Sequence, residues 1–530
     1  MSRDVIIGID AGTSVLKAVA FSLSGQQLAV RSTPNVFVSG QGGRAEQNMA
    51  RTWTDAATAI RALLQDVPEL RHRVAAIGVT GQGDGLWLID EGGAPVQPAW
   101  LWLDSRSSAL ADEIRRSDAG RRAYQGTGTA LTGCKQSMQL AWLKAHDPTT
   151  LARATTAFHC KDWLYFNLTG ERATDPSEAT YTFGDYRRRS YDDGVIAALG
   201  LDAQRALLPP IIDGAITTHG LSPKASAVTG LDAGTPVALG YIDVVCTALG
   251  AGLYDRDADV GCSIIGSTGA HMRLARGADN VRLNPESTGE TMPMPIEGAF
   301  LQMQSSMAAS LNVDWLVDLA RGVLSSAGVA KSRSDILAGF DASVMGADTA
   351  GLLYHPYISE AGERGPFVNA RAKAQFTGLS AKHGFAELLR AVFEGVALAA
   401  RDCYAAMGPI PKEIRVTGGA SRSAPLKTIL GAALDARIVA SAREETGAAG
   451  AAMIAALGVG AQSSIDACVD QWVRPLLRPG DPPNRALAAR YDRLFPTFQR
   501  IRKAMPPSWN ALAKDKTDDR PTRRGKSEAI

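Results

Sequence analysis

The chain opens on a strand, a turn and a second strand, and the same pattern returns near its middle. Residues 5–9 are apolar and mostly β-branched, residues 11–14 have turn chemistry, and residues 18–21 are apolar again. Residues 260–265 form a similar apolar run that leads into the turn 266–269 and a further apolar stretch. Because 530 residues are too many for one hydrophobic core, this recurrence indicates two related halves.

Strands and helices alternate within both halves. Residues 51–65 show helical spacing of apolar side chains, and residues 74–79 form a short strand before a glycine-rich loop. In the second half, residues 386–402 are amphipathic, and residues 414–416 lead through a glycine turn into a helical segment at 425–434. Such alternation is typical of an α/β fold.

We divide the chain into a first domain at residues 1–250, a second at 251–505 and a tail at 506–530. The tail loses apolar periodicity and is charged, which predicts disorder. It also accounts for the net charge of +2, because six basic and four acidic residues follow Leu512. The rest of the chain is formally neutral, which gives no electrostatic case for nucleic acid as a partner.

The cysteines and the N-terminal segment bear on the compartment. Six cysteines stand singly, without a CxxC pair or a Cys/His cluster. In a long chain without an export signal, we expect them to be free thiols. The apolar run 5–9 is too short for a signal sequence or a membrane span. We therefore expect a cytoplasmic protein with no membrane partner.

The first turn has the chemistry of a phosphate-binding loop. Its glycine lets backbone N–H groups approach a phosphate, and Thr13 and Ser14 add hydroxyl donors. Lys17 lies near enough to place a positive charge by a terminal phosphate, and Asp10 is a candidate ligand for Mg²⁺, directly or through water. The alternative is an ordinary hairpin with polar turn residues.

Two later glycine segments bear on this choice. Gly266, Ser267 and Thr268 repeat the layout in the second half, and two facing turns can grip a polyphosphate from both sides. Gly418 and Gly419 open a helix, where backbone can lie flat against a nucleotide. The pair of turns favours phosphate binding more than either turn does alone.

Asp243 follows the predicted strand 235–239 and precedes a helical run. Ligand groups in α/β sheets lie at such strand ends. Transfer of a phosphoryl group to an alcohol needs one carboxylate that orients the hydroxyl and accepts its proton, and Asp243 is suited to this role. The alternative is that Asp243 caps the helix, and both roles are compatible.

A third group of polar residues is suited to binding hydroxyls. Gln82 and Asp84 lie in a glycine-rich loop, and Trp102 and Arg106 follow a later apolar segment. Gln, Asp and Arg make directional hydrogen bonds to vicinal hydroxyls, and Trp offers a flat wall for C–H groups. The alternative is ordinary loop polarity, with Trp102 in the core.

Taken in order, these motifs resemble the FGGY family of carbohydrate kinases over residues 4–500. The matching segments are Ile9-Asp10-Ala-Gly-Thr13, Glu46-Gln47-Asn48, Gly81-Gln82, Trp102-Leu-Asp104-Ser-Arg106, Lys161-Asp162, Leu168-Thr-Gly170, Thr174-Asp175, Gly240-x-x-Asp243, Gly266-Ser-Thr268, Pro356-Tyr357, Glu363-Arg364-Gly-Pro366, Glu394-Gly395, Thr417–Ser423 and Glu445–Gly450. The resemblance implies two actin-like (ribonuclease H-like) domains, with MgATP and a sugar or polyol in the cleft between them.

The resemblance also implies residue roles. Asp243 matches the family's catalytic base, and Asp10 with Thr13 matches its first phosphate loop. Gly266 and Thr268 match the second loop; Gly418 and Gly419 match the adenosine site. Homodimers are common in the family, so we regard a homodimer as possible.

The acceptor loop departs from two branches of this family. Gly83-Asp84 stands where xylulose-type members carry Met-His, and the Arg-Glu pair of glycerol-type members is absent. The loop is most similar to that of the erythritol-type members, which implies phosphorylation of a primary hydroxyl on a small polyol. A ketopentose kinase of the L-xylulose type is the main alternative. A catalytically inactive sugar sensor and an actin-like chaperone ATPase are remoter ones.

Overall fold

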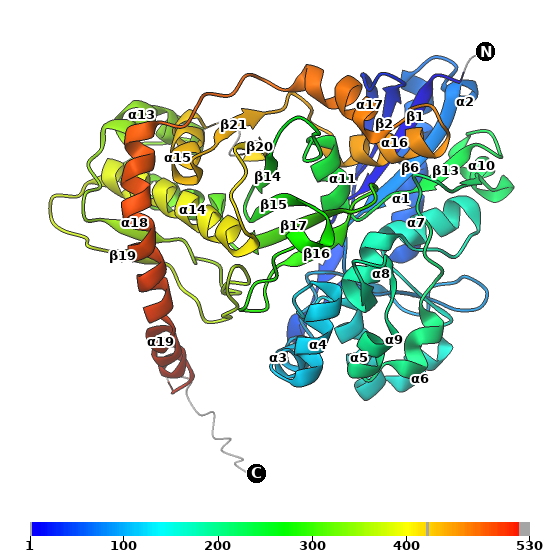
Figure 1. Ribbon diagram of the computed structural model, residues 1–530, viewed down its shortest axis with the longest axis horizontal. Helices are drawn as coiled ribbons and strands as arrows, with labels where there is room; N and C mark the ends of the chain where they lie inside the picture. The colour runs from blue at the N-terminus through cyan, green and yellow to red at the C-terminus, as the bar shows by residue number, and fades with distance from the viewer. Residues whose placement is uncertain (1–2, 420–422, 519–530) are drawn as a thin grey trace, which may run out of the picture.

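A computed structural model describes residues 3–419 and 423–518, which form two six-stranded sheets (Figure 1). The first sheet has the order β12 (Thr218–Gly220), β13 (Pro236–Leu239), β6 (Val74–Gly81), β1 (Val5–Ala11), β2 (Val15–Ser22) and β3 (Gln27–Pro34). The second has the order β16 (Glu290–Pro293), β17 (Ala299–Ser306), β15 (Gly269–Arg276), β14 (Val260–Ile265), β20 (Glu413–Thr417) and β21 (Arg437–Ala440).

The two sheets share one five-stranded plan. In each, three antiparallel strands lie beside two that continue in parallel: β3-β2-β1-β6-β13 in the first and β17-β15-β14-β20-β21 in the second. The predicted opening hairpins are therefore confirmed as equivalent β1–β2 and β14–β15 pairs. Each sheet adds one edge strand, β12 on the first and β16 on the second.

The helices expected from apolar spacing are present. They are α1 (Met49–Asp66), α11 (Asp243–Gly250), α14 (Phe385–Met407) and α15 (Ala424–Leu434). Helix α1 faces the first sheet with buried Ala56, Ile60 and Leu63, as an amphipathic helix does. Helices α14 and α15 pack on each other in the second half (Figure 1). The α/β fold with two actin-like units is thus confirmed.

Helix α16 (Thr446–Gly458) comes late in the chain but packs on the first sheet, against β1, β6 and α11. Figure 1 shows it beside the N-terminal strands. The approach is close because the facing strands carry glycine: a Cβ on Gly8 would lie 2.1 Å from the carbonyl oxygen of Ala448, and one on Gly78 would lie 2.1 Å from that of Ala451. The two halves therefore share a packed interface.

Replacing Gly78 by alanine is expected to destabilise the protein by about 1–3 kcal/mol, because the added methyl group meets helix backbone that cannot rotate away. Thermal unfolding followed by circular dichroism measures the change. Gly322→Ala is the matched control, because a Cβ there meets no atom within 4 Å and alanine favours the helix. Equal melting temperatures for Gly78→Ala and wild type would contradict the role of the close contact.

The expected disorder from residue 506 onward is wrong for the described part of the tail. Helix α18 (Arg485–Ala504) is followed by α19 (Pro506–Asp518) along one edge of the molecule (Figure 1). Trp509 is 3% exposed, stacks on Phe367 at a ring-centroid distance of 6.0 Å and donates its indole N–H to the carbonyl of Lys373. The burial of Trp509 therefore orders this segment in spite of its charged residues. Residues 519–530 lie outside the described residues.

Two further expectations concern the described residues. All six cysteines are buried and free, as predicted for thiols with no partner in sequence. Across residues 3–419 and 423–518, no helix is long and apolar enough to cross a membrane.

Candidate active site

A cavity of about 230 Å³ lies between the two halves. Its polar lining comes from both: Thr13, Asp84, Trp102, Tyr181 and Asp243 belong to the first half, and Thr268, Glu290, Ser305 and Arg364 to the second. The predicted interdomain cleft is therefore present. It brings together one phosphate-type turn from each half and the carboxylate that the sequence singled out.

Asp243 is the first residue of α11, directly after β13 and a short loop. Ile242 occupies the N-cap position instead, so the helix-cap alternative for Asp243 is not what the structure shows. Burial and, after it, the nearby carboxylate of Asp10 together raise the pKa of Asp243 to about 8. A carboxyl in this environment is a stronger base than an exposed aspartate.

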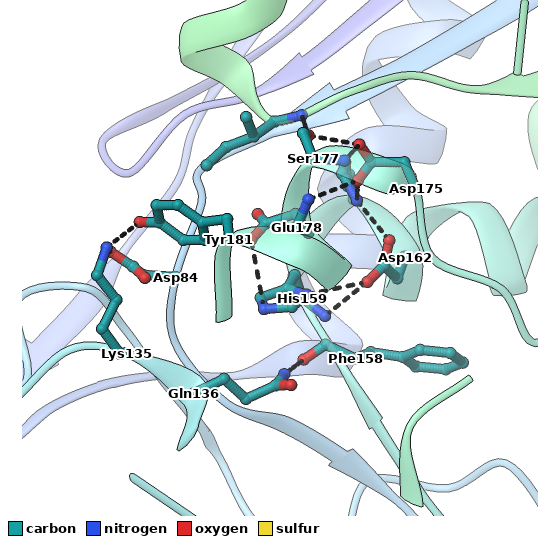
Figure 2. A network of polar contacts seen from close by, with 12 residues as sticks. Asp84, Lys135, Gln136, Phe158, His159, Asp162, Asp175, Ser177, Glu178 and Tyr181 are labelled. Carbon is teal, nitrogen blue, oxygen red and sulfur yellow. Dashed lines mark hydrogen bonds and ion pairs between the residues drawn. The ribbon is translucent and has the colours of Figure 1, made fainter. Parts of the chain in front are cut away.

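A buried polar chain holds the backbone in front of Asp243, and Figure 2 shows its members Asp175 and Ser177. The N–H of Ile242 donates to Ser177 Oγ at 3.0 Å, and this hydroxyl in turn donates to Asp175. The other oxygen of Asp175 lies 2.6 Å from the Lys161 ammonium. Lys161, Asp175 and Ser177 therefore fix the entry to α11, and with it the position of Asp243.

Lys161 forms ion pairs with two carboxylates at the buried end of this hydrogen-bond network. Its Nζ also lies 2.6 Å from Asp162, whose other oxygen accepts the backbone N–H of His159 at 3.0 Å. Burial alone would lower the pKa of Lys161, but Asp162 and Asp175 raise it above its usual value. Burial would raise the pKa of Asp162, but Lys161 and His159 together bring it down to about 2. Both charges are therefore kept in the interior.

Thr13 is held in place by two of the predicted acceptor-site residues. Its hydroxyl donates to Gln82 Oε1 at 3.0 Å and accepts the indole N–H of Trp102 at 2.7 Å. Gln82 is 2% exposed, and its amide group also donates to Gln47. Trp102 lines the cavity, whereas Gln82 lies behind it and supports the turn.

Arg106, a predicted acceptor residue, does not line the cavity either. Its guanidinium lies 2.7 Å from Asp104 and 2.8 Å from Glu46, and it stacks 3.6 Å above the ring of Trp100. These partners satisfy the charge within the first half. Arg106 thus braces the loop that presents Trp102, and the geometry does not support its predicted contact with an acceptor.

The other predicted residues of the first turn, Asp10, Ser14 and Lys17, differ in their surroundings. Burial raises the pKa of Asp10 to about 6, while Lys17 opposes this rise and Glu445 adds to it. The Lys17 ammonium is paired with Glu445 of the second half at 2.7 Å. Ser14 is exposed. Lys17 therefore links the two halves in this structure, instead of standing free for a phosphate as predicted.

The second turn, residues 266–269, contacts the start of α12 (Ser310–Ser326). The N–H of Gly266 donates to the carbonyl of Thr268 at 3.0 Å, which closes the turn, and the carbonyl of Ser267 accepts the N–H of Ala309 at 2.7 Å. Ser267 and Thr268 are exposed, and Thr268 lines the cavity. Their hydroxyls are therefore available to a ligand.

Gly418 and Gly419 follow β20 and do not line this cavity. Gly418 has a φ of 85°, and a Cβ on it would lie 2.7 Å from the carbonyl oxygen of Ile265. A Cβ on Gly419 would meet open space. Position 418 thus requires glycine, and the role of this turn in binding adenosine stays a prediction.

Sequence reasoning missed three residues of the site: Lys135, Tyr181 and Glu290. The Lys135 ammonium donates to Tyr181 and lies 3.3 Å from Asp84 and 2.9 Å from Glu290 (Figure 2 shows Asp84 and Tyr181). No motif marks Lys135 or Glu290, and 155 positions separate them in the chain. Arg364 also lines the cavity; it stood in a family motif, Glu363-Arg364-Gly-Pro366, without an assigned role.

Comparison with known proteins identifies the domains. Residues 5–250 match the N-terminal domain of the FGGY family of carbohydrate kinases, and residues 262–459 match its C-terminal domain. The erythritol kinase of Brucella abortus (strain 2308) is 50% identical over 513 residues, which cover 97% of this chain and 98% of that protein. The L-xylulose/3-keto-L-gulonate kinase of Escherichia coli (strain K12) is 28% identical over 459 residues, 86% of this chain and 88% of that protein.

Solved structures support the fold. A gluconate kinase from Lactobacillus acidophilus superposes with a TM-score of 0.86 at 22% identity, over 96% of this chain and 99% of the other. A xylulose kinase from Rhodospirillum rubrum gives a TM-score of 0.84 at 26% identity, over 96% and 100%. The fold thus occurs in proteins with different named acceptors, so the acceptor must be argued from the lining of the cavity.

Proposed function

This chain belongs to the FGGY family of carbohydrate kinases, and we propose that it phosphorylates a primary hydroxyl of a small polyol, erythritol, with ATP as donor. The erythritol kinase is far more similar to this chain than the xylulose-type relatives are. The observation that carries the proposal is the lining of the cavity, where the carboxylates of Asp84, Asp243 and Glu290 can accept hydrogen bonds from hydroxyls of a neutral acceptor.

In the proposed reaction, Asp243 binds the attacking hydroxyl and accepts its proton. The hydroxyl oxygen forms a bond to the γ-phosphorus as the bond from that phosphorus to ADP breaks. Burial, which raises the pKa of Asp243 to about 8, makes its carboxylate a better acceptor for this proton. The Trp102 ring forms an apolar wall of the cavity, which helps to exclude water from the reacting groups.

Mg²⁺ that accompanies ATP fits the surroundings of Asp10. Asp10 is partly exposed, and its neighbour Lys17 is paired with Glu445. Within the described residues, no cation forms a direct ion pair with Asp10, so a divalent ion would compensate its charge. Mg²⁺ would supply neutralisation of phosphate charge, and the exposed Ser267 and Thr268 would donate hydroxyl hydrogen bonds to phosphate oxygens.

A screen of acceptors tests the proposed function. We expect the highest kcat/KM for erythritol in a coupled ADP-release assay that compares it with glycerol, xylitol, D- and L-xylulose, and D- and L-ribulose. A missing hydroxyl leaves buried polar groups of the site unpaired, which lowers kcat/KM by about tenfold or more per lost hydrogen bond. High activity on a ketopentose together with inert erythritol would establish the L-xylulose-type alternative instead.

Two expectations from the sequence stay predictions. The first is a cytoplasmic location, which fits the use of ATP. The second is a homodimer, which the oligomeric mass of the purified protein would test.

A further inference from the structure

One wall of the cavity holds an ammonium group between two carboxylates that come from different halves of the protein. Asp84 belongs to the first half, and Glu290 begins β16 of the second sheet. The Lys135 Nζ lies 3.3 Å from Asp84 and 2.9 Å from Glu290. Both carboxylates line the cavity, while Lys135 does not, and its side chain is only 1% exposed. A ligand in the cavity therefore meets the carboxylates and not the cation.

We call the ion pairs Asp84–Lys135–Glu290 the bridge. Backbone hydrogen bonds beside it fix the two halves relative to each other. The N–H of Ala130 donates to the carbonyl of Gly289 at 2.9 Å, next to Glu290 in the chain. The Tyr124 hydroxyl donates to the carbonyl of Thr288, also at 2.9 Å. The segment 288–290 of the second half is therefore docked on the segment 124–135 of the first, and the position of Glu290 follows from this contact.

The two carboxylates of the bridge have acceptor oxygens that can still bind hydroxyl groups. Asp84 Oδ1 is buried without a hydrogen-bond partner among the described residues, although Asp84 lines the cavity. Asp84 also has a φ of 57°, in the left-handed region, and its other oxygen accepts hydrogen bonds from Cys134 and Lys135. The Glu290 side chain is 16% exposed, and one of its oxygens contacts Lys135. A carboxylate accepts more than one hydrogen bond, so both groups can receive hydroxyl donors.

We propose that Glu290 is an acceptor-binding residue supplied by the second half. Lys135 is the positioning residue: it holds the carboxylates of Glu290 and Asp84 where each can accept a hydrogen bond from a different hydroxyl of one polyol. This inference rests on the proposed polyol kinase function and deepens it. The ammonium compensates the two carboxylates only in part, since one positive charge faces two negative ones. At these two carboxylates the site therefore favours hydroxyl donors and disfavours sugar acids, whose carboxylate would meet Asp84 and Glu290; the cation Arg364 lines the cavity beside Trp102 and Met307 instead.

Glu290→Gln tests the proposal, because it keeps the size of the side chain and removes its charge. We expect the KM for erythritol to rise by about 10–100-fold, as for the loss of a hydrogen bond to a charged group, with the KM for ATP changed less than about twofold. Gluconate at high concentration is expected to leave the wild type uninhibited and to become a competitive inhibitor of the variant. Glu286→Gln is the control, because Glu286 lies four residues before Glu290 but is exposed.

Lys135→Met is the complementary variant. It leaves two carboxylates without their shared cation, so we expect lower acceptor affinity and lower stability. If Lys135→Met does not fold, the Glu290→Gln variant alone tests the proposal. A lower melting temperature of Glu290→Gln with an unchanged KM for the acceptor would reduce Glu290 to a structural role and overturn the proposal. Absence of gluconate inhibition in that variant would overturn the selection by charge.

The two levels of inference fail separately. If the wild type prefers a ketopentose, the proposed acceptor is wrong, and the Glu290→Gln comparison is made with that ketopentose. A selective rise in its KM would still establish Glu290 as an acceptor-binding residue. If erythritol is the preferred acceptor and its KM does not respond to Glu290→Gln, the proposed function stands and the inference about the bridge fails.

Discussion

Replacing Asp243 by asparagine is expected to lower kcat by a factor of about 10²–10⁴ while the protein stays folded. Asparagine has nearly the same shape, but it cannot accept the proton of the attacking hydroxyl. Burial and the Asp10 carboxylate both disfavour the charged form of Asp243, so the neutral side chain removes an electrostatic cost from the fold. Steady-state ADP release at saturating ATP and acceptor measures the effect, and circular dichroism reports the fold.

Asp193→Asn is the control for the Asp243 experiment, because its side chain is 87% exposed and remote from the cavity lining. The acceptor affinity of Asp243→Asn, measured by calorimetry, is expected to fall much less than its kcat. This division identifies a role in the transition state. Turnover near that of the wild type would show that another group accepts the proton.

The second large effect is expected for Lys161→Met, which should lower the free energy of unfolding by about 3–5 kcal/mol. Lys161 is fully buried and pairs with Asp162 and Asp175, so its removal leaves two buried carboxylates without their shared lysine cation. Denaturant unfolding measures the change. Lys224→Met, at an exposed position of α10 (Pro223–Thr229), is the matched control.

The Lys161 network also gives a pH dependence. Against the effect of burial, Lys161 and, after it, His159 hold the pKa of Asp162 at about 2, below its ordinary value of 3.8. This carboxylate therefore stabilises the fold at neutral pH, and its contribution is lost as the pH falls from about 4 toward 2. We expect Lys161→Met to flatten this acid limb. A variant with wild-type stability and an unchanged acid limb would show that the network does not depend on its buried cation.

The predictable part of this structure is local in sequence. The hairpin β1–β2, its counterpart β14–β15 and the strand before Asp243 follow from short runs of apolar residues and turn chemistry. The positions of Thr13 and Asp243 in the cavity follow in turn, because strand ends and their turns gather at one edge of each sheet. For this reason the residues closest to the chemistry were the easiest to predict.

The remainder depends on contacts between distant segments. Gln82 and Arg106 have the chemistry of acceptor ligands, but nearby partners already occupy them: Thr13 and Gln47 for Gln82, and Asp104 and Glu46 for Arg106. A single sequence does not show which polar group meets which. It equally hides the bridge at Lys135, whose second carboxylate comes from the other half.

The late position of α16 in the chain has a consequence for biosynthesis. The first sheet emerges from the ribosome long before residues 446–458, which cover the β1 and β6 face that carries Gly8 and Gly78. Until then, a strongly apolar surface is left to nascent-chain contacts or to chaperones. The first half therefore completes its core only when the second is nearly finished, and a separately expressed fragment of residues 1–250 is expected to aggregate.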